Sequence, residues 1–340
     1  MSQTVTPAAI AELQLQIPAW MNAADVPGLG LALIAGGRIE LVKGFGVMSR
    51  ATRQPVEATT LFAAASLSKP PFAYATLTLC DEGRLDLDAP LAGYVADPLA
   101  AAGLEQDSPD LLGITLRQVL SHCAGLGNWG DADRGRLSFA PGSRFAYSGE
   151  GYTYAQRVVE AVAGMPLDQF MAARLLGPLG MAQSSYVWRP EFEPFDADGH
   201  GVSSTGGHGF GQPWAAFSLL TTPADYARFV LATLAAGDDG PAHLSPALAA
   251  QMLAPQVAVR PGLSWGLGWG LAGDPAAPIF WHWGDIGDFQ CAVVGSRTGG
   301  QALVLMTNSE HGLPLCSAII RAALGQEFAA PFDLVIRAGW

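Results

Sequence analysis

The chain has 340 residues, half of them apolar, which is enough for one large two-layer domain or two smaller ones with a sizeable core. Its 18 basic and 30 acidic residues give a formal charge of −12, and such a surface repels nucleic acids and anionic membranes. We therefore expect a small molecule as partner, with neither nucleic acid nor membrane bound. The sequence leaves the oligomeric state open.

The N-terminal segment and the cysteines indicate in which cellular compartment the protein is located. The first twenty residues contain no Lys or Arg and no uninterrupted apolar run, so no export signal is predicted. No run of about 18 apolar residues, as a membrane-spanning helix requires, is present. Cys80, Cys123, Cys291 and Cys316 are far apart and lack metal-ligand spacing. These features predict reduced, mostly buried thiols in a cytoplasmic protein.

The hydrophobic patterns change twice along the chain. Residues 29–47 predict a β-hairpin, because two β-rich runs flank Gly36-Gly37, a pair suited to the positive φ angles of a tight turn. Two further strand-like runs, at 289–295 and 301–307, predict a second hairpin, and a helix is expected near 315–324. Between these ends the periodicity is helical, at residues 71–83, 115–122, 151–163, 166–175 and 223–236.

This order of elements predicts an α/β fold of the α+β type. One antiparallel sheet is built from both chain ends and flanked by helices, and a mostly α-helical domain is inserted between them. We expect residues 1–70 and 215–340 to form the sheet domain and residues 71–214 the helical domain, with the active site in the cleft between them. The glycine-rich segment 196–213 lacks the GxxxxGK[ST] pattern of a phosphate-binding loop.

Ser66 and Lys69 are the first candidate reactive pair. Lysine is rare in this chain, since Lys43 and Lys69 are the only two. At the start of a helix, a spacing of three residues places the Ser66 hydroxyl and the Lys69 amine on one face. A serine becomes a good nucleophile when a neighbouring base takes its proton, and burial at a helix start favours the neutral, basic form of lysine. Taken alone, the pattern also fits an ordinary surface lysine beside a serine-rich helix start.

Two further segments supply candidate groups. Tyr147 stands in a loop before a predicted helix, where its phenolate could accept the Ser66 proton and return it to the leaving group; a buried structural tyrosine is the alternative. The segment from Trp281 to Asp285 precedes the C-terminal hairpin, and a backbone N–H from such a strand edge would stabilise an oxyanion opposite the serine. By itself, His282 in this segment is more typical of a satisfied core or surface residue.

Together these segments resemble, in this order, the penicillin-recognising serine hydrolases, particularly the class C β-lactamases and the family VIII carboxylesterases with a β-lactamase-like fold. The S-x-x-K motif of that family matches Ser66 to Lys69, its Y-x-N matches Tyr147 to Gly149 in part, and its K-T-G corresponds to His282-Trp283-Gly284 as an H-x-G variant. Residues 114–126, 219–229 and 266–269 also resemble family segments. The resemblance extends from about residue 25 to 325.

The resemblance implies a role for each matching residue. Ser66 would form the acyl-enzyme, Lys69 would move or bias its proton, and Tyr147 would act as general base and then acid. The backbone N–H groups of Ser66 and Asp285 would form the oxyanion hole. His282, Trp283, Gly284 and Gly149 would contact the substrate, and neither metal nor cofactor is implied. His122 falls in a segment that is structural in the family.

One departure from the family pattern affects the expected substrate. The family asparagine whose amide binds lactam substrates is Gly149 here, which argues against efficient β-lactam hydrolysis and favours an esterase. Several tryptophans fall in loops and strand ends where they would border the cleft and favour an apolar or aromatic substrate: Trp129, Trp188, Trp214, Trp265, Trp269, Trp281 and Trp283.

The sequence thus predicts a serine carboxylesterase that acts on a small-molecule ester through an acyl-enzyme. Three alternatives remain open. The first is an amide or peptide hydrolase, of the D-aminopeptidase or weak β-lactamase kind, and the second is an acyltransferase. The third is a binding protein that keeps the fold without the chemistry.

Overall fold

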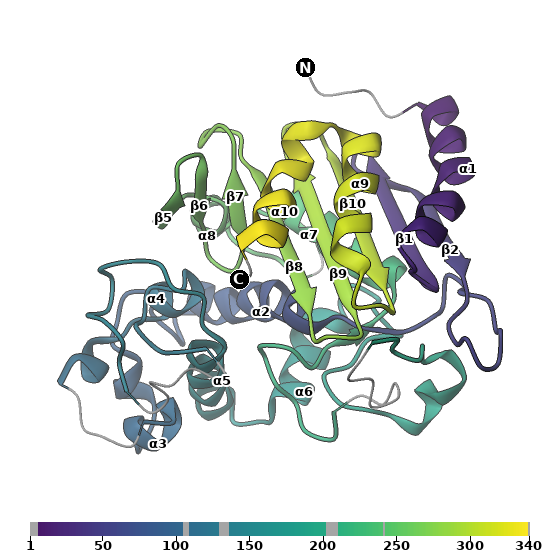
Figure 1. Ribbon diagram of the computed structural model, residues 1–340. Coiled ribbons are helices and arrows are strands. Elements are labelled where there is room, and N and C mark those ends of the chain that lie inside the picture. The colour runs from purple at the N-terminus through teal and green to yellow at the C-terminus, as the bar shows by residue number, and fades with distance from the viewer. Residues whose placement is uncertain (1–5, 105–108, 129–135, 202–209, 241, 339–340) are drawn as a thin grey trace.

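The computed structural model describes residues 6–104, 109–128, 136–201, 210–240 and 242–338. Within these ranges an eight-stranded antiparallel sheet has the order β2-β1-β10-β9-β8-β7-β6-β5 (Figure 1). Its strands are β1 (Gly28–Ala35), β2 (Arg38–Gly46), β5 (Val257–Arg260), β6 (Leu263–Trp265), β7 (Gly270–Ala272), β8 (Ile279–Asp285), β9 (Gln290–Ser296) and β10 (Gln301–Thr307). Strands from the two chain ends lie side by side where β1 pairs with β10, so the predicted fold class is confirmed.

The alternation of side chains along β1 explains why both faces of the sheet are covered. Leu29, Leu31 and Leu33 belong to the core under one layer of helices, whereas Ala32 and Ile34 belong to the core on the opposite face. The first layer consists of α1 (Pro7–Ala23), α9 (Gly312–Leu324) and α10 (Gln326–Ala338), and α7 (Pro223–Leu234) covers the second face.

Both predicted hairpins are present. Gly36 and Gly37 connect β1 to β2 with φ angles of +56° and +71°, the positive values that a two-residue turn of type I′ requires. The turn between β9 and β10 follows Ser296 and returns the chain at Gln301, with these two residues paired. The helix predicted after β10 is α9.

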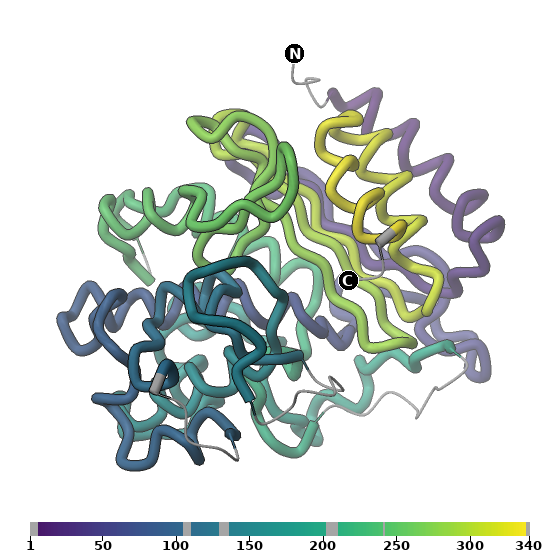
Figure 2. The backbone as a smooth tube through the Cα atoms, turned by 60° about the vertical axis from the view of Figure 1, so that its left-hand side comes forward, coloured from purple at the N-terminus to yellow at the C-terminus, as the bar shows by residue number. Residues whose placement is uncertain are grey.

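The middle of the chain is mainly helical, as predicted. It contains α2 (Lys69–Asp81), α3 (Pro98–Ala102), α4 (Leu116–Leu120), α5 (Gly149–Ala163) and α6 (Leu167–Met171), with 3₁₀ turns at Ala65–Ser68, Leu91–Tyr94, Pro109–Gly113 and Pro190–Phe195 and a π turn at Ala172–Leu176. The short helix α8 (Pro246–Met252) follows α7, and β3 (Phe62–Ala63) pairs with β4 (Leu220–Thr221). The tube view shows this helical part at the lower left and the sheet at the upper right (Figure 2).

The helix α2 connects the two parts. Eleven of its residues are buried, and it runs between the ends of the sheet strands and the helices α5 and α6 (Figure 1). The domain boundaries at residues 70 and 214 stay a prediction. None of the helices in the described ranges has the length and apolar character needed to cross a membrane. All four cysteines are free thiols, three of them buried, and the cytoplasmic location stays a prediction.

Candidate active site

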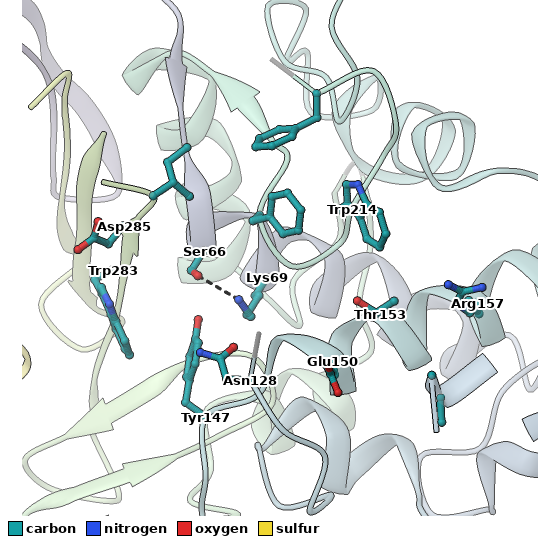
Figure 3. A pocket seen from close by; sticks show the side chains of 15 residues that line it. Ser66, Lys69, Asn128, Tyr147, Glu150, Thr153, Arg157, Trp214, Trp283 and Asp285 are labelled. Atoms are coloured by element: carbon teal, nitrogen blue, oxygen red, sulfur yellow. Dashed lines mark hydrogen bonds between the residues drawn. The ribbon is translucent and has the colours of Figure 1, made fainter. Parts of the chain in front are cut away.

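A cavity of about 680 Å³ opens where the end of β8 meets the helical part. Ser66, Lys69 and Tyr147, the three residues predicted to react, all line it. They come from the turn before α2, the start of α2 and the loop before α5, and Figure 3 shows their polar ends converging. The fold therefore brings together residues that are up to 81 positions apart in the sequence.

The Ser66 hydroxyl is presented by a tight turn with several fixed contacts. Ser66 lies in the 3₁₀ turn that leads directly into α2, where Pro70 and Pro71 occupy the first helical turn, positions at which proline costs no hydrogen bond. Ala65 has a φ of +49°, a left-handed conformation that is strained for a residue with a Cβ. Ser68 stabilises the turn, because its hydroxyl donates to Ala65 O at 2.6 Å and accepts from Leu219 N at 2.9 Å.

The Lys69 side chain lies in the protein interior, with 0% of its surface exposed. Its Nζ is 3.0 Å from Ser66 Oγ and donates to the Ala216 carbonyl at 2.9 Å. Burial lowers the pKa of the Lys69 amine well below its usual value, because the charged form loses its hydration. The neutral amine therefore presents a basic lone pair within hydrogen-bond distance of the serine.

Tyr147 faces the same two groups. Its phenol oxygen points toward Ser66 (Figure 3), and Lys69 Nζ lies 4.8 Å from the centre of its ring. Burial raises the pKa of the Tyr147 phenol, while the facing Ser66 hydroxyl lowers it to a smaller extent. Burial therefore disfavours both the phenolate of Tyr147 and the ammonium of Lys69. The role of Tyr147 as general base and then acid stays a prediction.

The end of β8 packs directly against the turn that carries the serine. A Cβ added to Gly284 would lie 2.3 Å from the Ala64 carbonyl oxygen, so only glycine allows this approach. The next residue, Asp285, lines the cavity. Its carboxylate turns back on its own loop, accepting from Gly287 N at 2.8 Å and from Gln290 Nε2 at 2.9 Å. Its backbone N–H stays a predicted oxyanion donor, together with that of Ser66.

The predicted substrate contacts fall into two groups. Trp283 lines the cavity, whereas His282, Gly284 and Gly149 are not among its lining residues. His282 is fully buried, with its ring 6.2 Å from that of Tyr147, and burial lowers its pKa to about 3. A neutral histidine behind Tyr147 shapes the site without carrying charge into it. Gly149 is the first residue of α5, and its N–H donates to Asn128 Oδ1 at 3.0 Å.

Two residues near Tyr147 were not predicted as part of the site. Asn128 lines the cavity beside Tyr147, and the only signal in the sequence was its place in a glycine-rich loop. The His122 ring packs against that of Tyr147 with 4.3 Å between ring centres and a tilt of 33°, and its Nδ1 accepts from the backbone N–H of Ser148 at 3.0 Å. His122 thus supports the Tyr147 ring and fixes the backbone directly after it.

Aromatic side chains form much of the cavity wall, although fewer tryptophans contribute than predicted. Trp214 and Trp283 line the cavity. Trp265, Trp269 and Trp281 are buried in the cores of the protein, Trp188 is half-buried away from the lining, and Trp129 lies outside the described residues. In the described residues no group of three or more His, Cys, Asp or Glu side chains is arranged to hold a metal ion, and the absence of a cofactor stays a prediction.

Comparisons with known proteins find relatives in sequence and in fold. A family model described as Beta-lactamase matches residues 15–326. Esterase EstB of Burkholderia gladioli is 31% identical over 182 residues, which cover 44% of this chain and 45% of that protein. Penicillin-binding protein 4 of Amycolatopsis lactamdurans is 29% identical over 175 residues, which cover 47% of this chain and 44% of that protein. The chain thus spans somewhat less than half the length of these curated relatives.

A solved structure extends the likeness to nearly the whole fold. The crystal structure described as a β-lactamase/D-alanine carboxypeptidase from Pseudomonas syringae superposes with a TM-score of 0.78 and covers 93% of this chain and 98% of its own. Only 19% of the aligned residues are identical, so this comparison bears on the fold alone.

Proposed function

The chain belongs to the β-lactamase family of serine hydrolases, and from this premise we propose that it cleaves carboxylic esters through an acyl-enzyme formed on Ser66. The observation that carries the proposal is the buried Lys69 amine, 3.0 Å from Ser66 Oγ. Burial lowers its pKa and so favours the neutral amine, the base that the serine needs to become nucleophilic.

Acylation begins at the ester carbonyl carbon. Ser66 Oγ forms a bond to this carbon while the Ser66 proton passes to Lys69 Nζ. The carbonyl oxygen becomes an oxyanion that accepts hydrogen bonds from the backbone N–H groups of Ser66 and Asp285. The ester C–O bond then breaks, and the departing alcohol oxygen takes the proton of the Tyr147 phenol.

Deacylation restores the starting state. The Lys69 ammonium returns a proton to the Tyr147 phenolate, whose ring centre is 4.8 Å from Nζ. A water molecule then attacks the acyl carbon and loses a proton to Lys69, and Ser66 recovers its proton as the carboxylic acid leaves. Tyr147 is a general acid in this scheme and Lys69 the general base, which reverses the first role considered for Tyr147.

Ester specificity rests on two observations. Position 149 has no side chain to bind the amide of a lactam or peptide substrate, and the cavity wall includes the aromatic rings of Trp214, Phe217 and Trp283, which suit an apolar acyl or alcohol group. The name of Esterase EstB points to the same chemistry. An amide hydrolase is the second candidate, supported by the D-alanine carboxypeptidase named for the structural neighbour and by the amide that Asn128 places at the cavity.

The proposed partner is a small-molecule ester. With a formal charge of −12, the protein is not expected to bind nucleic acid or an anionic membrane surface. An acyltransferase would use the same acyl-enzyme, and an added alcohol or amine acceptor would then divert the acyl group from water.

The proposal is tested by intact-protein mass spectrometry after mixing with p-nitrophenyl butyrate and, separately, with a penicillin. We expect an acyl adduct and a burst of p-nitrophenol from the ester, both lost in Ser66→Ala. Thermal stability should be nearly unchanged in that variant. Ester turnover retained by Ser66→Ala would refute the assignment of the nucleophile. A stable penicillin adduct together with faster turnover of amides than of esters would favour the amide hydrolase.

A further inference from the structure

A second feature of the cavity indicates which esters enter it, and this inference rests on the proposed ester hydrolysis. The residues Glu150, Thr153 and Arg157 of α5 all line the cavity. Their spacing of three and four residues places them along one face of the helix. Figure 3 shows Arg157 at the end of this row that is farther from Ser66, beyond Thr153. The cavity therefore runs along α5 from the reactive serine to an arginine.

An aromatic wall faces this row and is fixed to the helix. Trp214 and Phe217 stack with ring centres 5.7 Å apart and planes at 15°, and both line the cavity. Gln156, the neighbour of Arg157, joins α5 to their segment, because it donates to Pro213 O at 3.0 Å and accepts from Ala215 N at 2.9 Å. These hydrogen bonds therefore hold the aromatic wall at a fixed position relative to the helix that carries Arg157.

The guanidinium of Arg157 is available to a ligand. Arg157 is exposed, and within the described residues no hydrogen bond or ion pair engages its side chain. Glu150 precedes it by seven residues, about 10 Å along a helix axis, which is too far for an ion pair. Lys69 and Arg157 are the basic side chains among the described lining residues. Burial disfavours the charged form of Lys69, whereas a guanidinium always carries its charge in proteins, so Arg157 is the permanent positive charge of the cavity.

We propose that Arg157 binds a carboxylate of the substrate, so that the favoured substrates are esters with an apolar or aromatic spacer between the ester and a remote carboxylate. The spacer lies against Trp214 and Phe217, and the carboxylate accepts two parallel hydrogen bonds from the planar guanidinium. The protein as a whole has a charge of −12 and repels anions, whereas Arg157 attracts an anionic substrate to this end of the cavity.

The kinetic test compares p-nitrophenyl hydrogen suberate, which carries a terminal carboxylate, with p-nitrophenyl octanoate, which has a methyl group there. In Arg157→Gln we expect the ratio of kcat/KM for the suberate to that for the octanoate to fall by about ten-fold or more, mainly through KM for the suberate. Arg157→Lys should keep part of the preference, because it retains the charge and loses the planar fork.

Arg38→Gln is the matched control. Arg38 is exposed in the β1–β2 hairpin, and the strand register places it at the opposite end of the sheet from Asp285. The substitution Arg38→Gln removes the same charge as Arg157→Gln. An equal change of the suberate-to-octanoate ratio of kcat/KM in Arg38→Gln would show that the effect comes from the net charge of the protein, and would overturn the proposal. An unchanged ratio in Arg157→Gln would also overturn it.

A binding experiment separates this proposal from the proposed function. In Ser66→Ala, which cannot form the acyl-enzyme, monoethyl suberate and the neutral diethyl suberate are titrated by calorimetry. We expect the monoester to bind more tightly than the diester, and Arg157→Gln in the same background to remove that difference. If the wild-type protein hydrolyses neither p-nitrophenyl ester, the proposed function fails while the titration still decides the role of Arg157. Equal binding of the two ligands would refute that role.

Discussion

Substituting Gly284 by alanine tests whether β8 supplies the oxyanion donor. The added Cβ would lie 2.3 Å from Ala64 O and 3.2 Å from Ala65 Cβ, whereas ordinary contacts begin at 3.4 Å. The strand and the serine turn must therefore separate by about 1 Å (3.4 − 2.3). Neither side moves freely, because β8 is paired with β9 along its length and Ala64 N donates to Leu219 O at 2.8 Å.

This separation should affect the rate more than the fold. Overpacking of this kind costs about 1–3 kcal/mol of the free energy of unfolding. Moving the Asp285 N–H by about 1 Å from the developing oxyanion should lower kcat by a factor on the order of 10² to 10³, the effect of losing one oxyanion donor. We therefore expect a folded protein that forms the acyl-enzyme slowly.

The assay measures p-nitrophenyl butyrate hydrolysis and urea unfolding on the same preparations. Gly93→Ala is the control, because a Cβ at Gly93 meets no atom within 4 Å, and its rate should stay within about two-fold of the wild type. A Gly284→Ala enzyme within ten-fold of the wild-type kcat would refute the placement of β8 as the oxyanion strand. If the fall in rate of Gly284→Ala is fully explained by the fraction of unfolded protein, the placement of β8 as the oxyanion strand is refuted as well.

Three further predictions concern the charge states of the site. Tyr147→Phe should lower kcat for esters of poor leaving groups by a factor on the order of 10² with little change in thermal stability, and an unaffected rate would remove Tyr147 from the proton path. The kcat/KM for a neutral ester should rise with pH as Lys69 loses its proton, in a limb well below the usual pKa of 10.5; a limb at or above that value would contradict a buried neutral amine. Burial lowers the pKa of His282 from 6.5 to about 3, so between these pH values the unfolded state binds a proton that the native state does not. The free energy of unfolding should therefore fall by up to about 5 kcal/mol (3.5 × 1.36) as the pH falls from 6.5 to 3. Urea titrations of the wild type and His282→Gln across this range should show a weaker acid dependence in the variant, and identical slopes would refute the buried neutral state.

The fold was predictable where local rules determine the structure. The Gly36-Gly37 hairpin follows from turn chemistry over a few residues, and the helix α5 has a clear apolar face and a serine N-cap. The helices α1 and α10 were not predicted, although Thr6 caps the start of α1. Each contains an internal proline, Pro18 and Pro331, which in a sequence argues against a helix. Their stability comes from packing on the sheet, a long-range effect that periodicity does not report.

The short strands were hidden for a related reason. The strands β6 (Leu263–Trp265) and β7 (Gly270–Ala272) have three residues each, too few to show an alternation of apolar and polar side chains. They exist because β7 pairs with the edge of β8 and β6 pairs with β7, and because Trp265 of β6 is buried in the core. A pattern of three residues in the sequence reports neither the neighbouring strand nor the burial of the side chains.

The site divides in the same way. The pairing of Ser66 with Lys69 is local, since both lie on one turn of chain, and the sequence was sufficient to predict it. The charge state of Lys69 is not local, because it depends on burial by segments such as that of Ala216, 147 residues away. The position of Asn128 at the cavity depends on its hydrogen bond to Gly149, 21 residues further on, and no spacing rule predicts such a contact.

The buried environment also explains why two neutral groups suit this chemistry better than an ion pair. An ammonium on Lys69 and a phenolate on Tyr147 would both lose hydration in these buried positions, so burial disfavours that ion pair in the resting enzyme. When Ser66 attacks, a positive charge forms on Lys69 at the moment that a negative charge forms on the substrate oxygen, so each stabilises the other only in the transition state. The neutral His122 and His282 add no competing charge behind Tyr147. The same low dielectric that shifts these pKa values therefore favours the reacting state over the resting one.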